Sequence, residues 1–363
     1  MQAPALLSLL LAALLLSACA GGVDPAAFER TAAGEIARRP DHYTNGTARA
    51  FLVVWDGQAR GLLWGTIHVR YEGDTVMPRA IRDRFAEASD LTVEIPLDRL
   101  SVADRSALGQ AIQRVELRPD PVALAQLDPS ARAALDAVGL PSGSTERLSF
   151  VGLARAIMRR AWAGPSRALR PTDFVDANLM GFARSRNIPV HGLDTREFAF
   201  GLSSVDPNGA EAAGLLRQTL RQQDTVQDLL AWVRSSYGRG RVAEVLAGMT
   251  AWQANADDLS REDRHRGGLL TNRNRAWVPL LDVILAKPGF HFVAFGAGHL
   301  TGEDGVVALL RQQGWQVLPC PNDNCPTPEA EKQAASDQEA VPTRLTAHTF
   351  GDPGRDPPTR TAE

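Results

Sequence analysis

The chain has 363 residues, of which 44% are hydrophobic and 22% are charged. This composition is typical of a globular protein and excludes a chain that is disordered throughout. The 39 Lys and Arg residues nearly balance the 42 Asp and Glu residues, for a formal net charge of −3. Seven acidic and four basic residues lie in residues 326–363, so the rest of the chain is neutral. We therefore expect no nucleic-acid partner.

An uncharged run of mostly Leu and Ala occupies residues 5–18. It is shorter than the roughly 20 residues that a helix needs to cross a bilayer, and it has the length of a signal-peptide apolar region. The run ends in Leu16-Ser17-Ala18-Cys19, which resembles the bacterial lipobox. This resemblance implies that residues 1–18 are a lipoprotein signal peptide and that Cys19 carries the lipid.

The two residues after Cys19 are Ala20 and Gly21. They lack the Asp that commonly retains lipoproteins at the inner membrane, so the resemblance implies an outer-membrane anchor facing the periplasm. The protein would then touch the membrane through its lipid alone. The alternative is a cleaved secretory signal followed by an incidental cysteine.

Two other cysteines, Cys320 and Cys325, lie close together near the end of the body. In an oxidising periplasm such a pair is expected to form a disulfide. Half of a zinc site is the alternative interpretation, but Cys19 is the only other cysteine in the chain that might complete it.

Residues 19–47 are expected to form a tether with an opening helix. The predicted α/β elements begin after it. Asp56-Gly57 is a hairpin turn signal between two apolar runs. Ile81 and Phe85 are spaced four residues apart, which indicates a helix. The elements expected here are strands over residues 50–55 and 61–68, a helix over residues 78–88 and a strand over residues 90–95.

Beyond residue 95, the sequence becomes rich in Ala, Leu and Arg, which predicts a mainly helical insertion over about residues 97–275. The other expected elements are strands over residues 188–194, 290–296 and 315–318, and helices over residues 276–286 and 305–313. Strands that alternate with helices predict an α/β domain over residues 48–325, with a mixed central sheet flanked by helices. Residues 326–363 are expected to form a disordered acidic tail.

A short pattern occurs twice along the chain. Gly65-Thr66-Ile67-His68 and Gly296-Ala297-Gly298-His299 each follow an apolar strand and precede a helix. We therefore expect the fold to be built from two related half-units whose histidines meet at one place.

His68 and His299 are the candidate metal ligands, because ligands bind at the carboxyl ends of strands in open α/β sheets. Glu94 and Asp194 follow two other predicted strands. Two histidines with one or two carboxylates suit Zn, Mn, Co or Fe. For a lone histidine a structural role is the usual alternative, and it is the role expected for His291, which lies within a strand among aromatic residues.

Four blocks of the sequence resemble the TraB/GumN family and cover about residues 50–320 in matching order. The blocks are Leu63-Trp64-Gly65-Thr66-Ile67-His68 followed by Glu94, Gly192-Leu193-Asp194-Thr195-Arg196-Glu197, Thr271-Asn272-Arg273-Asn274-Arg275-Ala276-Trp277 and Phe295-Gly296-Ala297-Gly298-His299-Leu300-Thr301-Gly302. The family is similar to the Tiki metalloproteases and, more distantly, to the erythromycin esterases and the ChaN haem-binding lipoproteins.

The resemblance implies a Tiki-like peptidase that uses Mn, Co or Zn to hydrolyse a peptide or another small acyl substrate. His68, His299, Glu94 and Asp194 would bind the metal ion. Glu94, Arg273 and Asn274 would be catalytic, although many members have Gly-Leu-Glu where this chain has Gly-Leu-Asp. Without the resemblance, residues 272–275 read as a helix N-terminus with Asn caps and solvated arginines. A non-catalytic periplasmic lipoprotein that binds peptide, glycan or haem is the alternative function.

Overall fold

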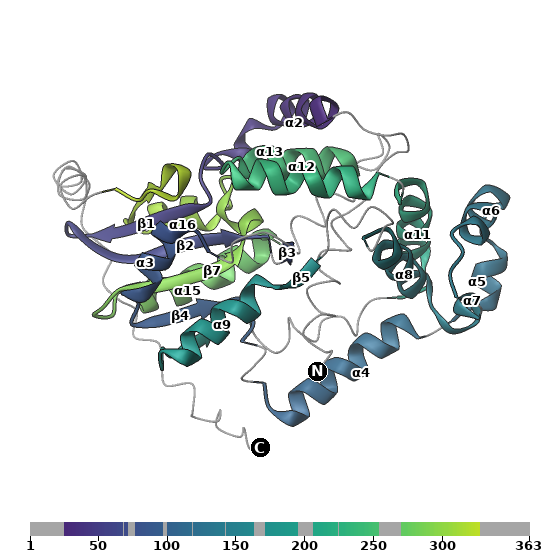
Figure 1. Ribbon diagram of the computed structural model, residues 1–363, viewed down its shortest axis with the longest axis horizontal. Helices are drawn as coiled ribbons and strands as arrows, with labels where there is room; N and C mark the ends of the chain where they lie inside the picture. Colours follow the sequence, from purple (N-terminus) through teal and green to yellow (C-terminus); the bar gives the residue numbers. More distant parts are fainter. Residues whose placement is uncertain are drawn as a thin grey trace, which may run out of the picture.

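The computed structural model describes residues 25–67, 69–71, 77–96, 100–117, 119–141, 143–162, 171–194, 206–223, 225–253 and 270–326. Its centre is a mixed six-stranded sheet with the order β6-β4-β7-β2-β1-β8. The strands are β1 (Ala50–Trp55), β2 (Gln58–Thr66), β4 (Asp90–Val93), β6 (Val190–Gly192), β7 (His291–Gly296) and β8 (Gln316–Pro319). Figure 1 shows this sheet at the left of the molecule.

Four neighbouring strands, β6, β4, β7 and β2, run parallel, so their carboxyl ends share one edge of the sheet. Strand β1 is antiparallel to both β2 and β8. Asp56 and Gly57 connect β1 to β2 with φ angles of 49° and 66°, the left-handed conformation of a tight hairpin turn. The expected α/β fold is therefore confirmed.

Alternating side chains of the strands build a core on each face of the sheet. Leu52, Leu62 and Phe292 face helices α3 (Arg79–Ala86) and α9 (Val175–Ser185). On the opposite face, the buried residues belong to the sheet and to helices α15 (Asn272–Leu285) and α16 (Val306–Gln312), and they include Phe51, Leu63, Phe295, Trp277 and Leu310. Helix α15 therefore packs directly on the strands that carry the candidate site.

Most of the described residues between β4 and β7 are helical. The described helices of the predicted insertion, besides α9, are α4 (Val102–Glu116), α5 (Pro121–Ala125), α6 (Pro129–Ala137), α7 (Ser144–Arg147), α8 (Phe150–Trp162), α11 (Ala210–Gln222), α12 (Val226–Gly238) and α13 (Val242–Gln253). Helices α4 to α8 and α11 lie to the right of the sheet in Figure 1. Helices α4, α6, α8 and α11 share a core of their own, which includes Val115, Leu135, Ile157 and Leu216.

The insertion also returns to the sheet, because β6 within it forms one edge. It further supplies β5 (Pro171–Phe174), which pairs with β3 (Val69–Tyr71) in a separate two-stranded sheet that the sequence did not predict. Among the described residues, no helix is long and apolar enough to cross a membrane.

The described part of the segment predicted over residues 19–47 contains the expected opening helix. From Pro25 the chain forms helix α2 (Pro25–Arg38) and a short 3-10 helix, η1 (Pro40–Tyr43). Phe28 stacks on Trp232 of α12, with ring centroids 5.4 Å apart, and Ala32 is fully buried. This apolar burial holds the segment on the body. Cys19 and residues 327–363 lie outside the described residues.

At the amino end of β7, the buried His291 has the structural role that the sequence indicated. Its Nδ1 lies 2.8 Å from a carboxylate oxygen of Asp90, and its Nε2 lies 3.2 Å from the carbonyl oxygen of Lys287. Both partners are acceptors, so the protonated imidazole, which donates from both ring nitrogens, is the form that these contacts favour. The hydrogen bond to Asp90 raises the pKa of His291 above its ordinary value of 6.5.

This arrangement predicts how stability changes with pH. A raised pKa in the folded state means that His291 stabilises the fold fully below about pH 6.5 and loses this contribution as pH rises through the folded pKa. We expect the difference in unfolding free energy between the parent and a His291→Gln variant to shrink as pH rises from 6 to 9. Urea unfolding across this range measures it, and a difference that grows with pH would contradict the assignment.

Candidate functional site

The carboxyl ends of the parallel strands bring together residues that are far apart in the sequence. Glu94 directly follows β4, and Asp194 lies two residues beyond β6. His299 lies on a short 3-10 helix, η4 (Ala297–Leu300), which follows β7. This edge of the sheet is where open α/β folds bind their ligands.

Arg273, in the first turn of α15, contacts all three of these side chains. Its Nη2 lies 2.5 Å from Glu94 Oε2 and 2.7 Å from Asp194 Oδ2. Its Nε donates to Asp194 Oδ1 at 3.2 Å, and its Nη1 lies 3.1 Å from His299 Nε2. All four side chains are at least 90% buried. We call these four residues the Arg273 cluster.

The ionisable groups of the Arg273 cluster lie in direct contact and are shielded from solvent. Burial raises the pKa of Asp194, although Arg273 acts in the opposite direction. Burial by itself lowers the pKa of Arg273, but the charges of Glu94 and Asp194 outweigh it, so the pKa is raised. The guanidinium therefore stays charged and compensates carboxylates whose unpaired burial would cost several kcal/mol.

The hydrogen bonds around His299 fix its tautomer. Arginine only donates, so His299 Nε2 must accept from Arg273. The proton is therefore on Nδ1, which donates to Asn274 Oδ1 at 2.5 Å. Asn274 Nδ2 donates in turn to the carbonyl oxygen of Asp304 at 2.8 Å, which orients the amide. Histidines that bind metals are held in this way, with the second nitrogen donating to an oxygen.

Two further groups, which the sequence analysis did not identify as functional, complete the cluster. The indole of Trp277 donates to Asp194 Oδ1 at 2.8 Å, and its ring lies 4.4 Å from Arg273 Cζ. The backbone N–H of Gly296 donates to Glu94 Oε1 at 2.6 Å. Trp277 lies four residues after Arg273 on one helix face, and this spacing is a signal that the sequence does contain.

The structure also decides between the two readings of residues 272–275. The side chain of Arg273 is 3% exposed and that of Arg275 is 63% exposed, so only the second is a solvated arginine. Thr271 and not an Asn occupies the N-cap, and it makes no capping side-chain bond. Residues 272–275 do form the N-terminus of α15, as expected, but the Asn cap and the solvated position of Arg273 are wrong, because α15 turns Arg273 and Asn274 toward the sheet.

His68, the other predicted ligand histidine, lies outside the described residues. The strand that leads to it is described: Thr66 of β2 pairs in parallel with Gly296 of β7. Gly65 packs against the second motif so closely that a Cβ there would lie 2.8 Å from Ala297 Cα and 2.5 Å from Leu300 Cδ1. Only glycine allows this approach. The two Gly-x-x-His segments therefore start side by side.

The donors in the cluster are compatible with a divalent ion. His299 Nε2 and Glu94 Oε1 lie 3.8 Å apart. Bonds of about 2.0–2.2 Å from one ion can span such a pair. Within the described part of the chain, no three His, Cys, Asp or Glu side chains are arranged as a complete metal site. A site on these donors therefore needs a ligand from elsewhere, and His68 is the predicted one.

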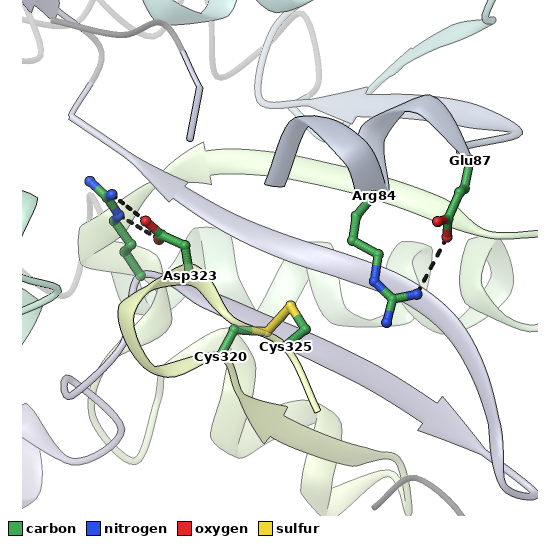
Figure 2. The surroundings of a disulfide bond; sticks show 6 residues. Arg84, Glu87, Cys320, Asp323 and Cys325 are labelled. Atoms are coloured by element: carbon green, nitrogen blue, oxygen red, sulfur yellow. Dashed lines mark hydrogen bonds and ion pairs between the residues drawn. A yellow bond between two sulfur atoms is a disulfide. The ribbon is translucent and has the colours of Figure 1, made fainter. Parts of the chain in front are cut away.

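The remaining candidates lie away from the cluster. Cys320 and Cys325 are joined by a disulfide at the end of β8 (Figure 2). Two of the chain's three tyrosines are buried and hydrogen-bonded: Tyr43 donates to Glu35 Oε1 at 3.2 Å, and Tyr237 donates to the carbonyl oxygen of Gly65 at 2.6 Å.

The cluster predicts unequal effects for two arginines of the same helix. Arg273→Met leaves Glu94 and Asp194 buried without their cation, which costs about 3–5 kcal/mol. Arg275→Met, at an exposed site, should change stability by about 0.5 kcal/mol or less. Chemical unfolding monitored by circular dichroism measures both, and equal losses would contradict the role of Arg273.

Comparison with known proteins gives one finding. The pattern that describes the TraB/PrgY/gumN family matches residues 50–319, which is more than half of the chain. No curated protein and no solved structure gives a significant match. The matched range contains all six strands of the main sheet and the whole Arg273 cluster. The chain therefore belongs to the TraB/PrgY/gumN family.

Proposed function

We propose that this protein is a metal-dependent hydrolase of the cell envelope, acting as a Tiki-like peptidase on a peptide or another acyl bond. One observation supports it above the rest: Glu94, Asp194 and His299 converge, buried, on Arg273. A group of strongly coupled ionisable residues at the ligand-binding edge of an α/β sheet is typical of an active site.

The proposed metal ion is Mn, Co or Zn, held by His68, His299 and Glu94. Asp194 was expected in the same ligand set. Arg273 donates to both oxygens of Asp194, whereas the two oxygens of Glu94 accept from different donors, Arg273 and the Gly296 N–H. We therefore assign Asp194 the task of anchoring Arg273 and keep Glu94 as the carboxylate ligand. A divalent ion held there would lower the pKa of a water ligand to about 7.

Three side chains of the site would have separate roles in the proposed hydrolysis. Glu94 accepts hydrogen bonds from Arg273 and the Gly296 N–H, and it would take the proton of the attacking water. Arg273 would place its positive charge beside the oxygen on which negative charge develops. Asn274 would act through His299, by keeping its Nε2 unprotonated and aimed into the cluster.

The proposed location is the periplasmic face of the outer membrane, with Cys19 lipidated after removal of residues 1–18. The Cys320–Cys325 disulfide supports an oxidising compartment. The membrane would be contacted only through the lipid, and nucleic acid is not a proposed partner.

A non-catalytic periplasmic lipoprotein that binds peptide, glycan or haem is the second candidate. One observation favours it: Arg273 Nη1 donates to the same His299 nitrogen that a metal ion would use. Arg273 can thus supply the positive charge that these side chains surround, without a bound metal ion. In that case the protein would hold a ligand without cleaving it.

Digestion of a peptide library separates the two candidates. We expect the mature protein to cleave peptides when Mn, Co or Zn is added and to stop when a chelator removes the ion. Glu94→Gln should reduce the rate by about 10²–10⁴-fold. Glu303→Gln, an exposed carboxylate, is the matched control and should leave the rate unchanged. If peptides remain intact with each of the three metals, the proposed peptidase activity is refuted.

Lipidation has its own test. Cys19→Ser should release the protein from the outer-membrane fraction into the soluble periplasm, because Cys19 supplies the thiol that carries the lipid. Fractionation with immunoblotting measures this. Unchanged retention in the membrane fraction would refute the anchor.

A further inference from the structure

Gly65, the first residue of the first Gly-x-x-His segment, is held from two sides. Its N–H donates to the carbonyl oxygen of Arg49 at 2.7 Å. Its own carbonyl oxygen accepts the hydroxyl of Tyr237 at 2.6 Å. Because Gly65 packs directly on Ala297 and Leu300, its position sets how closely the two motif segments approach.

Tyr237 comes from α12 of the helical insertion and is buried. Burial raises the pKa of the Tyr237 hydroxyl, so the group remains a donor at any physiological pH. The guanidinium of Arg49 lies over the ring of Tyr237, 4.8 Å from its centroid. Arg49 also donates to the carbonyl oxygen of Tyr237 at 3.4 Å. Arg49 thus contacts both Tyr237 and Gly65.

Arg49 is fixed in turn by a two-bond ion pair with Asp323. Its Nε lies 2.7 Å from Asp323 Oδ1, and its Nη2 lies 2.5 Å from Oδ2. The two side chains are 13% and 11% exposed, so water screens this pair weakly. Charge-assisted bonds in this paired geometry orient both partners.

The loop that carries Asp323 is held in an uncommon conformation. Asn322 and Asp323 have φ angles of 49° and 65°, which non-glycine residues seldom adopt. The Cys320–Cys325 disulfide closes this loop, and Asp323 N–H donates to the Cys320 carbonyl oxygen at 3.1 Å. Figure 2 shows Asp323 and its dashed contacts beside the disulfide. The covalent closure therefore keeps the carboxylate directed at Arg49.

We propose that Tyr237, Arg49 and Asp323, anchored by the disulfide loop, are positioning residues that hold Gly65 and so set the distance between the two Gly-x-x-His segments. The metal-binding part of this inference rests on the proposed function, in which both histidines bind one ion. The contacts run from the disulfide loop that follows β8, through the helical insertion, to the carbonyl of Gly65, three residues before His68. They give both regions a role in shaping the site.

The test uses two substitutions that remove one contact each. Tyr237→Phe deletes only the hydroxyl that holds Gly65, and Asp323→Asn weakens the ion pair while leaving Tyr237 intact. Glu87→Gln is the matched control, because it breaks the Arg84–Glu87 pair, which is also drawn in Figure 2 but is exposed to solvent. All variants are compared as the mature, disulfide-bonded protein.

The first measurement is hydrogen exchange of a peptide covering residues 61–67, with a peptide covering β4 as internal reference. We expect exchange of the first peptide to be at least fivefold faster in Tyr237→Phe and Asp323→Asn, with the β4 peptide and Glu87→Gln unchanged. Equal exchange in all proteins would overturn the proposal. So would a uniform acceleration in both peptides, because that result indicates a general loss of stability.

The second measurement is calorimetric titration of the metal-free protein with Co²⁺ alone. We expect both test variants to bind Co²⁺ at least tenfold more weakly than the parent and Glu87→Gln to match it. Unchanged affinity in both variants would overturn the positioning role. If the parent itself binds no Co²⁺, Mn²⁺ or Zn²⁺, the proposed function fails, and hydrogen exchange still decides whether these residues hold Gly65.

Discussion

One buried guanidinium organises the candidate site. Glu94 and Asp194 follow two different strands, and their carboxylates could not both be buried without a cation between them. Arg273 supplies that cation from the first turn of α15, and it reaches His299 with another nitrogen. The ends of β4, β6 and β7 and the start of α15 are therefore coupled by charge as well as by apolar packing.

The sheet makes this coupling possible because four parallel strands end at one edge. The pairing of Thr66 with Gly296 brings together two segments of the same sequence pattern. The close packing of Gly65 on Ala297 and Leu300 then leaves little freedom in how these segments meet. Groups from outside the motifs, Tyr237 and Arg49, hold the same glycine through its backbone. The site is thus supported both by its own charges and by the scaffold.

Much of this could be read from the sequence, since long apolar runs and their turn signals locate β1, β2 and β7. The positions of Glu94, Asp194 and His299 at strand ends could be read in the same way. The orientation of side chains could not. Arg273 and Arg275 lie in the same Asn-Arg-Asn-Arg run, and only the rotation of α15 against the sheet buries one and exposes the other. Strands β3 and β5 are short and lie about a hundred residues apart in the sequence, so no local pattern predicted either strand.

The central claim is that Arg273 and Asn274 hold His299 with its proton on Nδ1 and the lone pair of Nε2 directed into the cluster. Nitrogen NMR of the metal-free protein labelled with ¹⁵N-histidine measures this directly, with the His299 signals identified by their loss in His299→Gln. We predict a neutral ring with a protonated Nδ1 and an unprotonated Nε2. A proton on Nε2, in the other neutral tautomer or in an imidazolium, would contradict the account.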